Sequence, residues 1–309
     1  MNVARDAIVV AVGVDGAEAA LQYAVIEARR TGRPVHLVHV LQLPGVQAYA
    51  GGYGAAMEAS REVLDKALAA AAHLAGDDVS VTGHLIDDGW VVDDLVRGTV
   101  GDRMLVLQHR AFNPLHRFVT GSIVQGVAGR AHVPVVSVPE GWTPGSSTVV
   151  TAAVQDPVEA PGLLRIAFEE ARTRSQELVV LHAWWLASGF DVAVVDETMR
   201  SDWAARSRAE LEPVLRSLRA EFPDVSVSVE IRHAPPVEAI LDAARTSDLV
   251  VMGRRHHRLP LASHLGPVVR AAIAHASSPV LVTPELAVPG RRSVEPTRPY
   301  RSEELTAYS

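Results

Sequence analysis

Two stretches of the chain combine glycine with cationic residues where an apolar run gives way to a helical pattern. The first runs from Gln108 to Ile123, and the second runs from Gly253 to Pro267. Each contains the end of a buried strand, a basic loop and a glycine, Gly121 or Gly266, that opens a helix. Backbone N–H groups are free at a helix N-terminus, which is where α/β proteins hold phosphate groups. These residue types therefore predict a site for a phosphate-bearing ligand or a small anion.

The basic loop of the second stretch, Arg254 to Arg258, is the densest positive patch in the chain. Side chains such as Arg255 and His256 could replace missing glycine donors and hold an anion through charge-assisted hydrogen bonds. The alternative, which we favour, is a solvated loop above a helix N-terminus. His109 and Arg110 form a weaker analogue in the first stretch.

No catalytic arrangement is found in the sequence. The chain has no cysteine, which excludes thiolate catalysis, disulfides and cysteine metal sites. The motifs Gly-x4-Gly-Lys-Ser/Thr and Gly-x-Ser-x-Gly are absent, and Ser122 has no base in register. His39 and His182 hold equivalent strand positions without clustered partners, so we interpret them as structural residues and not as metal ligands. We therefore predict a protein that is not an enzyme.

Composition narrows the range of partners. The chain is 48% hydrophobic and carries a net charge of −7, which argues against a nucleic-acid binder that neutralises phosphates. The longest nearly apolar stretch, 178–195, contains polar residues and is a poor membrane span. The first residues do not follow the pattern of a secretory signal. We expect a cytoplasmic protein with neither a nucleic-acid nor a membrane partner.

The two glycine-containing stretches belong to an internal repeat. Equivalent residues are 145 positions apart, as in Gln108 and Gly253, Gly121 and Gly266, and Pro134 and Pro279. A repeat of this length predicts two similar domains. We place the first at residues 1–143 and the second at 148–286, and we interpret 287–309 as a disordered tail because it is polar and aperiodic.

Hydrophobic periodicity gives both halves the same order of elements. A β-branched run at 8–13, for example, is followed by helical spacing at 17–30 and a second buried run at 35–40. Five strands alternate with four helices in each half, which predicts a mostly parallel α/β sheet with helices on both faces. The last strands, 133–138 and 280–283, would have exposed edges that need pairing.

These features together resemble the universal stress protein family in its tandem form. The resemblance rests on a first strand that ends in Val14-Asp15-Gly16, on a histidine near the end of strand two, and on a late signature related to Gly-x2-Gly-x9-Gly-Ser/Thr. It implies two open five-stranded sheets with the strand order 3-2-1-4-5. It also implies that the last strands pair within the chain as a pseudo-dimer, or with a second chain in a homodimer.

In some members of the family, the resemblance further implies ATP at the carboxyl ends of strands one and four, in agreement with the general rule for open α/β sheets. An acidic residue of strand one then lies by the nucleotide, a position after the strand-two histidine meets adenine, and the signature cradles the phosphates. The first half matches this site at Asp15, Gly16, Val40, Gly121, Ser122 and Ile123.

Both copies of the signature are incomplete. In the first half, Gln108 and Ala111 replace the two loop glycines. The second half keeps Gly253 and Gly266, but Gln155 replaces the acidic residue, His256 the second glycine, and Pro267 the hydroxyl residue. Because Pro267 removes an N–H donor and His256 is bulky, we expect the better nucleotide site in the first half.

The function that we expect from the sequence is a non-enzymatic role in the stress response or in signalling. It includes a degenerate adenine nucleotide site for ATP, with Mg²⁺ accompanying the nucleotide. One alternative is an interaction scaffold that needs no nucleotide and whose crevices are filled by its own side chains or by an anion. An enzyme that uses or hydrolyses ATP is the least supported alternative.

Overall fold

A computed structural model describes residues 6–42, 52–87, 89–109, 120–157, 160–186, 195–254 and 265–284 of the chain. The expected disordered tail, 287–309, lies outside these residues. The first unit contains strands β1 (Ile8–Val12), β2 (Val35–Val40), β3 (Val81–Ile86), β4 (Met104–His109) and β5 (Val135–Pro139), with helices α1 (Glu18–Thr31), α3 (Tyr53–Ala75), α4 (Val91–Gly98) and α5 (Thr120–Ala128).

The second unit repeats the order of the first. Its strands are β6 (Val149–Ala153), β7 (Glu177–Trp184), β8 (Val227–His233), β9 (Leu249–Gly253) and β10 (Val280–Thr283), and its helices are α6 (Pro161–Arg174), α8 (Glu197–Glu221), α9 (Pro236–Ala244) and α10 (Pro267–His275). Strand β1 starts at Ile8 and β2 spans Val35–Val40, as expected, and α1 begins and ends one residue later than the expected range 17–30.

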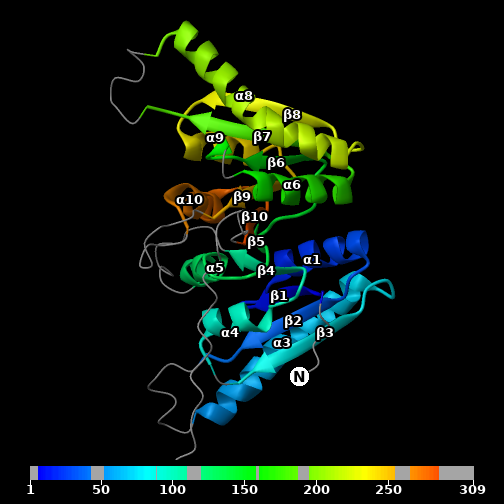
Figure 1. Cartoon of the computed structure of the whole chain (residues 1–309). Helices are drawn as coiled ribbons and strands as arrows, with labels where there is room; N and C mark the ends of the chain where they lie inside the picture. Colours follow the sequence, from blue (N-terminus) through cyan, green and yellow to red (C-terminus); the bar gives the residue numbers. More distant parts are fainter. Residues whose placement is uncertain are drawn as a thin grey trace, which may run out of the picture.

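All ten strands form one sheet with the order β3-β2-β1-β4-β5-β10-β9-β6-β7-β8. Neighbouring strands within each unit are parallel. The two units meet where β5 and β10 pair antiparallel, with Val136 opposite Leu281 (Figure 1). The exposed edges of the two last strands therefore pair with each other within the chain.

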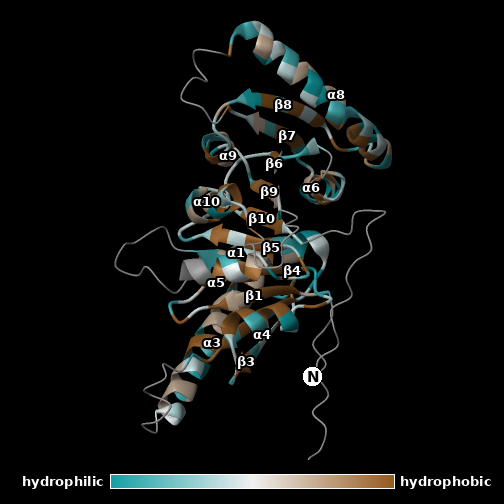
Figure 2. Ribbon diagram, turned by 60° about the vertical axis from the view of Figure 1, so that its left-hand side comes forward, coloured by the Kyte–Doolittle hydropathy of each residue, from teal (hydrophilic) through white to brown (hydrophobic). Residues whose placement is uncertain are grey.

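Two hydrophobic cores lie on the two faces of this sheet and run through both units. Side chains of α1, α3, α6 and α8 pack on one face. Those of α4, α5, α9 and α10 pack on the other. Successive residues of each buried strand alternate between the two cores, as the period of a β-strand requires. Figure 2 shows hydrophobic residues concentrated in the central strands and polar residues along the outer helices.

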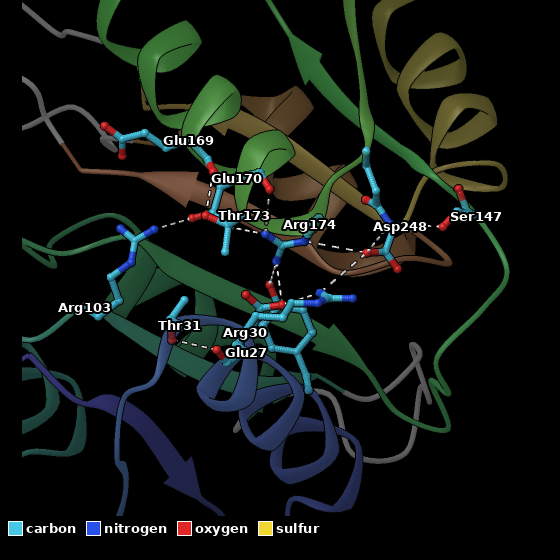
Figure 3. A network of polar contacts seen from close by, with 12 residues as sticks. Glu27, Arg30, Thr31, Arg103, Ser147, Glu169, Glu170, Thr173, Arg174 and Asp248 are labelled. Carbon is cyan, nitrogen blue, oxygen red and sulfur yellow. Dashed lines mark hydrogen bonds and ion pairs between the residues drawn. The ribbon is translucent and has the colours of Figure 1, made fainter. Parts of the chain in front are cut away.

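A buried ion network joins the two units on the α1 and α6 face (Figure 3). The Arg174 side chain of the second unit is fully buried and lies 2.8 Å from Glu27 Oε1 of the first unit. It also donates to the Tyr23 hydroxyl at 2.9 Å and pairs with Glu170, which in turn receives a hydrogen bond from Arg103 of the first unit at 2.8 Å.

Burial and opposite charge shift the pKa values of the residues in this network in opposite directions. Burial raises the pKa of the Glu27 carboxyl above its ordinary value, although Arg174 lowers it. Burial alone would lower the pKa of Arg174, but the surrounding Tyr23, Glu27 and Glu170 raise it overall. The guanidinium therefore stays charged. Loss of either partner would leave an unpaired charge in the interface.

The segment between the units is packed against them. Residues 140–147, which are rich in Gly, Pro and Ser, connect the two units. In the structure, the Trp142 ring meets the Tyr23 ring edge-on, with 5.6 Å between the centroids. The Ser147 hydroxyl donates to the Thr246 carbonyl of the second unit. These contacts hold the connection beside the ion network.

Candidate nucleotide-binding crevices

Each unit has a topological switch point at the carboxyl ends of its first and fourth strands, where the strand order reverses. In the first unit these are β1 and β4, and in the second they are β6 and β9, paired in parallel in both cases. Open α/β sheets bind ligands at such switch points. The helix that follows each first strand, α1 or α6, begins at the switch point and directs its N-terminus toward it.

Gln108 occupies the N-terminus of α1 in the first unit. Its side-chain Oε1 accepts a hydrogen bond from the Ala19 amide at 2.8 Å, and it lies 3.4 Å from the Ala20 amide. Ala17, the N-cap residue of α1, provides no side-chain cap of its own. The Gln108 carboxamide thus satisfies N–H groups that are otherwise free at a helix start. These donors are the ones that an anionic ligand would need.

The acidic position of the first unit lies in a tight turn after β1. Gly16 has a φ of 88°, which favours glycine, and Gly13 and Gly16 form an isolated bridge. A Cβ on Gly16 would lie 2.5 Å from the Glu18 carboxylate. Asp15 is exposed in this turn. The turn thus fixes the backbone of both expected site residues.

Val40, at the expected adenine position, ends β2 and is 5% exposed. It packs in the core beneath α4 and α5. The preceding residue, His39, bonds through Nδ1 to the Val12 carbonyl at 2.8 Å, and His182 makes the equivalent contact with Val154 at 2.9 Å. Both histidines therefore tie the second strand of a unit to its first. No group of three or more metal-ligating side chains occurs in the part of the chain that the structure describes.

The remaining expected residues are only partly described. Gly121 and Ser122 lie in the first turn of α5, and Ile123 is half-buried against the core. Arg255 and His256 lie outside the described residues.

The second-unit crevice contains a cavity of about 410 Å³, which is in the range of small-molecule sites. Its walls come from the ends of β6, β7 and β9 and from the first turns of α6, α9 and α10; the lining residues are Ala153, Val154, Gln155, Asp156, Ala160, Leu163, Leu181, Ala183, Pro236, Ile240, Met252, Gly253, Arg254, Val268 and Val269. Most of the lining side chains are apolar, and Gln155, Asp156 and Arg254 are the polar ones. Three helix N-termini converge on it, and their partial positive charge favours an anion.

Gly253 lines this cavity, and Gly266 shortly precedes two other lining residues, Val268 and Val269. Gly253 ends β9 at the position equivalent to Gln108, and a Cβ there would lie 3.7 Å from Leu163 and 3.9 Å from Thr283. No side chain from this position can cap α6 as Gln108 caps α1. Gly266 is the N-cap of α10, with Pro267 following as the first helical residue. The N–H groups of the next two residues, Val268 and Val269, belong to that first turn, and both residues line the cavity.

Arg254, the first residue of the basic patch, lines the cavity but turns its guanidinium to backbone carbonyls. Nη1 donates to Gly129 of the first unit at 2.9 Å, Nη2 donates to Ala131, and Nε lies 3.3 Å from the Thr283 carbonyl. Arg254, which belongs to the basic patch that the sequence suggests as an anion site, is therefore a structural anchor between the units.

Other titratable groups near the crevices have structural partners. Asp93 and Asp94 pair with Arg130 and Arg97, so they do not form an acid–base pair. His109 is buried and shares a 2.8 Å hydrogen bond with the Ser137 hydroxyl. Burial, together with the nearby His275, lowers the pKa of His109 to about 4. It is therefore neutral at pH 7.

Aromatic side chains cover the sheet beside the second crevice. Trp184 is 7% exposed and stacks on Trp203 of α8 at 5.0 Å, while His233 lies 4.3 Å from it on the adjacent strand. Trp185 stacks on His233 at 5.0 Å. The rings thus attach α8 to the ends of β7 and β8. Tyr53 begins α3, and Tyr49 lies outside the described residues.

Comparison with known proteins gives one consistent result. The model of the universal stress protein family matches residues 4–139 and again 148–284. A universal stress protein of Mycobacterium tuberculosis is 28% identical over 304 residues, covering 88% of this chain and 94% of the relative. One from Mycolicibacterium smegmatis is 27% identical over 282 residues, covering 88% and 95%.

Solved structures agree with the fold. A universal stress protein from Archaeoglobus fulgidus aligns with a TM-score of 0.65 at 16% identity, covering 89% of this chain and 98% of that one. A putative universal stress protein from Pseudomonas aeruginosa aligns with a TM-score of 0.54 at 19% identity, covering 91% and 94%. No helix among the described residues is long and apolar enough to cross a membrane.

Proposed function

The chain belongs to the universal stress protein family in its tandem form, and from this membership we propose that it binds one adenine nucleotide, in the crevice of its second unit. The family's stress-response role applies to the chain as a whole. The single observation that carries the proposed site is the 410 Å³ cavity between β6, β9 and three helix N-termini.

The choice of the second unit reverses the preference that the signature residues suggested. In favour of it, Gly253 leaves space where Gln108 extends its side chain in the first unit. The Gln108 carboxamide takes the place that a phosphate oxygen would have at α1. The first unit then fits the alternative function, a scaffold whose crevice is closed by its own side chain.

The walls of the second cavity suit an adenine nucleotide. Apolar side chains such as Leu181, Ile240 and Met252 offer a surface for the base. The backbone N–H groups of Val268 and Val269 at the start of α10 suit a phosphate. Asp156, the carboxylate of the lining, could share a Mg²⁺ ion with the phosphates, since Mg²⁺ commonly uses one or two carboxylates together with substrate oxygens. Mg²⁺ would neutralise phosphate charge there.

We further propose that the protein retains the nucleotide and does not turn it over. Asp156 and Arg254 are the only titratable side chains among the described residues that line the cavity. The Arg254 guanidinium is directed to carbonyls, and a single carboxylate provides no acid–base pair.

Calorimetric titration of the full chain with ATP-Mg²⁺ tests the proposal directly. We expect saturable binding with one nucleotide per chain, and a higher melting temperature at saturation. Titration to millimolar ATP without heat or a shift in melting temperature would remove the nucleotide function and leave the scaffold. Phosphate release faster than from a Gly253→Gln variant, in which the crevice is filled, would contradict the non-enzymatic role.

A further inference from the structure

Arg254 connects the mouth of the second-unit cavity to a helix of the first unit. Its guanidinium donates to the carbonyls of Gly129 and Ala131, in the turn that ends α5. A cation at a helix C-terminus is stabilised both by the free carbonyls and by the helix dipole. Arg254 is also a lining residue of the cavity, so one side chain belongs to both places.

The residue just before α10, at the other end of the segment that follows β9, also contacts α5. Leu265, the residue before the N-cap Gly266, is 3% exposed and packs in the core with Val127 and Ala128 of α5. Its Cγ lies 3.7 Å from the place where a Cβ on Gly129 would be. Both described ends of the connection between β9 and α10 thus contact the C-terminal turn of α5.

The first unit has no arginine at the position equivalent to Arg254. The position equivalent to Arg254 is His109, which bonds to Ser137 within its own unit. His109 is neutral at pH 7 because burial lowers its pKa to about 4, and its imidazole cannot form the fork of donors that a guanidinium provides. Among the described residues, the second unit is therefore the one whose signature loop begins with a side chain that donates hydrogen bonds to the other unit.

We propose that Arg254 is a positioning residue that makes helix α5 of the first unit part of the second-unit nucleotide site. This inference rests on the proposed function. The guanidinium holds the end of β9 in place relative to the start of α10, between which the nucleotide phosphates would lie. Nucleotide binding and the order of α5 are then coupled. By thermodynamic reciprocity, a change that loosens the anchor weakens the nucleotide, and the nucleotide in turn stabilises α5.

Hydrogen exchange and titration of the full-length chain with ATP-Mg²⁺ test this coupling together. In the wild type, saturation should slow the exchange of amides in α5 (Thr120–Ala128) as well as those in α10. Arg254→Met keeps the aliphatic stem and removes the donors, so it should raise the nucleotide Kd by about five-fold or more and abolish the protection of α5.

Arg103→Met is the matched control. Arg103 also makes a cross-unit ion pair, with Glu170 at 2.8 Å, but it does not line the cavity. It should leave the Kd and the ligand-induced protection of α5 unchanged, which separates positioning from general cohesion of the units. If Arg254→Met does not fold, Arg254→Lys keeps the charge but loses the fork geometry, and it should show the same changes to a smaller degree.

The outcomes are distinguishable. Nucleotide binding by the wild type without slower exchange in α5 would overturn the coupling and leave the proposed function standing. Equal Kd values for Arg254→Met and Arg103→Met would do the same. Absence of nucleotide binding in the wild type would overturn the proposed function, and the coupling with it.

Discussion

Gly253→Gln is the change that tests most directly whether the second crevice is the nucleotide site. It gives the second unit the residue that the first unit has at the equivalent position. Gly253 does not have a positive φ, and a Cβ there meets its neighbours at 3.7 and 3.9 Å, which are ordinary contacts. The backbone should therefore accept the substitution. The longer side chain would extend toward the first turn of α6, as Gln108 does toward α1.

The size of the effect follows from the contacts of Gln108. Its Oε1 caps α1 at 2.8 Å, and a cap of this kind stabilises by about 1 kcal/mol. We expect Gly253→Gln without ligand to be as stable as the wild type or about 1 kcal/mol more stable. In the wild type, nucleotide at a hundred times its Kd should add about 2.7 kcal/mol, which corresponds to roughly 5–10 °C in melting temperature. The variant should lose this increment.

Thermal denaturation with and without ATP-Mg²⁺, together with calorimetric titration, measures both quantities. Gly253→Ala is the matched control, because its methyl group makes only ordinary contacts and does not fill the cavity. It should keep the wild-type Kd within a few-fold. Binding by Gly253→Gln with the wild-type Kd would refute the reasoning, since the nucleotide would then bind elsewhere or the side chain would not enter the crevice.

Three further results are expected. Gln108→Gly should lower the melting temperature, because it removes a cap of α1 that contributes about 0.5–2 kcal/mol. If the substitution also opens the first crevice, titration should show a second bound nucleotide, and a stoichiometry of one would mean that other groups close this crevice as well. Arg174→Met should lower the free energy of unfolding in urea by about 3–5 kcal/mol, because two buried carboxylates lose their partner. Arg165→Met removes an exposed ion pair and should cost far less, so equal costs would contradict the role of the buried network. The folded pKa of His109, about 4, is below its unfolded value of 6.5, so the free energy of unfolding should fall by about 3 kcal/mol as the pH drops through this interval. His109→Gln should lose this part of the acid sensitivity, whereas His73→Gln, at an exposed position, should retain it.

Much of the fold could be predicted because its causes are local. Helix α1 lies within one residue of the predicted range 17–30, because its apolar spacing is regular. The pairing of β5 with β10 was predictable for another reason. A parallel unit leaves its last strand with an open edge, and a repeat supplies a matching one.

Whether a side chain fills the space at each switch point could not be predicted, because this depends on contacts between residues that are distant in sequence. A missing glycine at Gln108 indicates only that space is reduced. Whether its carboxamide reaches the start of α1 depends on how β4 lies beside β1. The anchoring of Arg254 on α5 is hidden in the same way, since a backbone carbonyl acceptor leaves no trace in residue types.

The ion network between the units had a signal that could have been used. Glu27 lies on the apolar face of α1, and Glu170 and Arg174 lie on that of α6. A charged residue on such a face is either a functional group or one half of a buried pair. Sequence alone did not show that the partners come from opposite halves of the chain.

The difference between Gln108 and Gly253 has a consequence for how a binding site can be inherited. In a two-fold homodimer, every substitution occurs in both subunits at once, so a glutamine at this position would close both crevices. In a tandem chain the equivalent positions are separate codons, and Gln108 and Gly253 can differ. A mutation that would remove ligand binding from a homodimer therefore removes half of it here, and the closed half remains free to acquire another use.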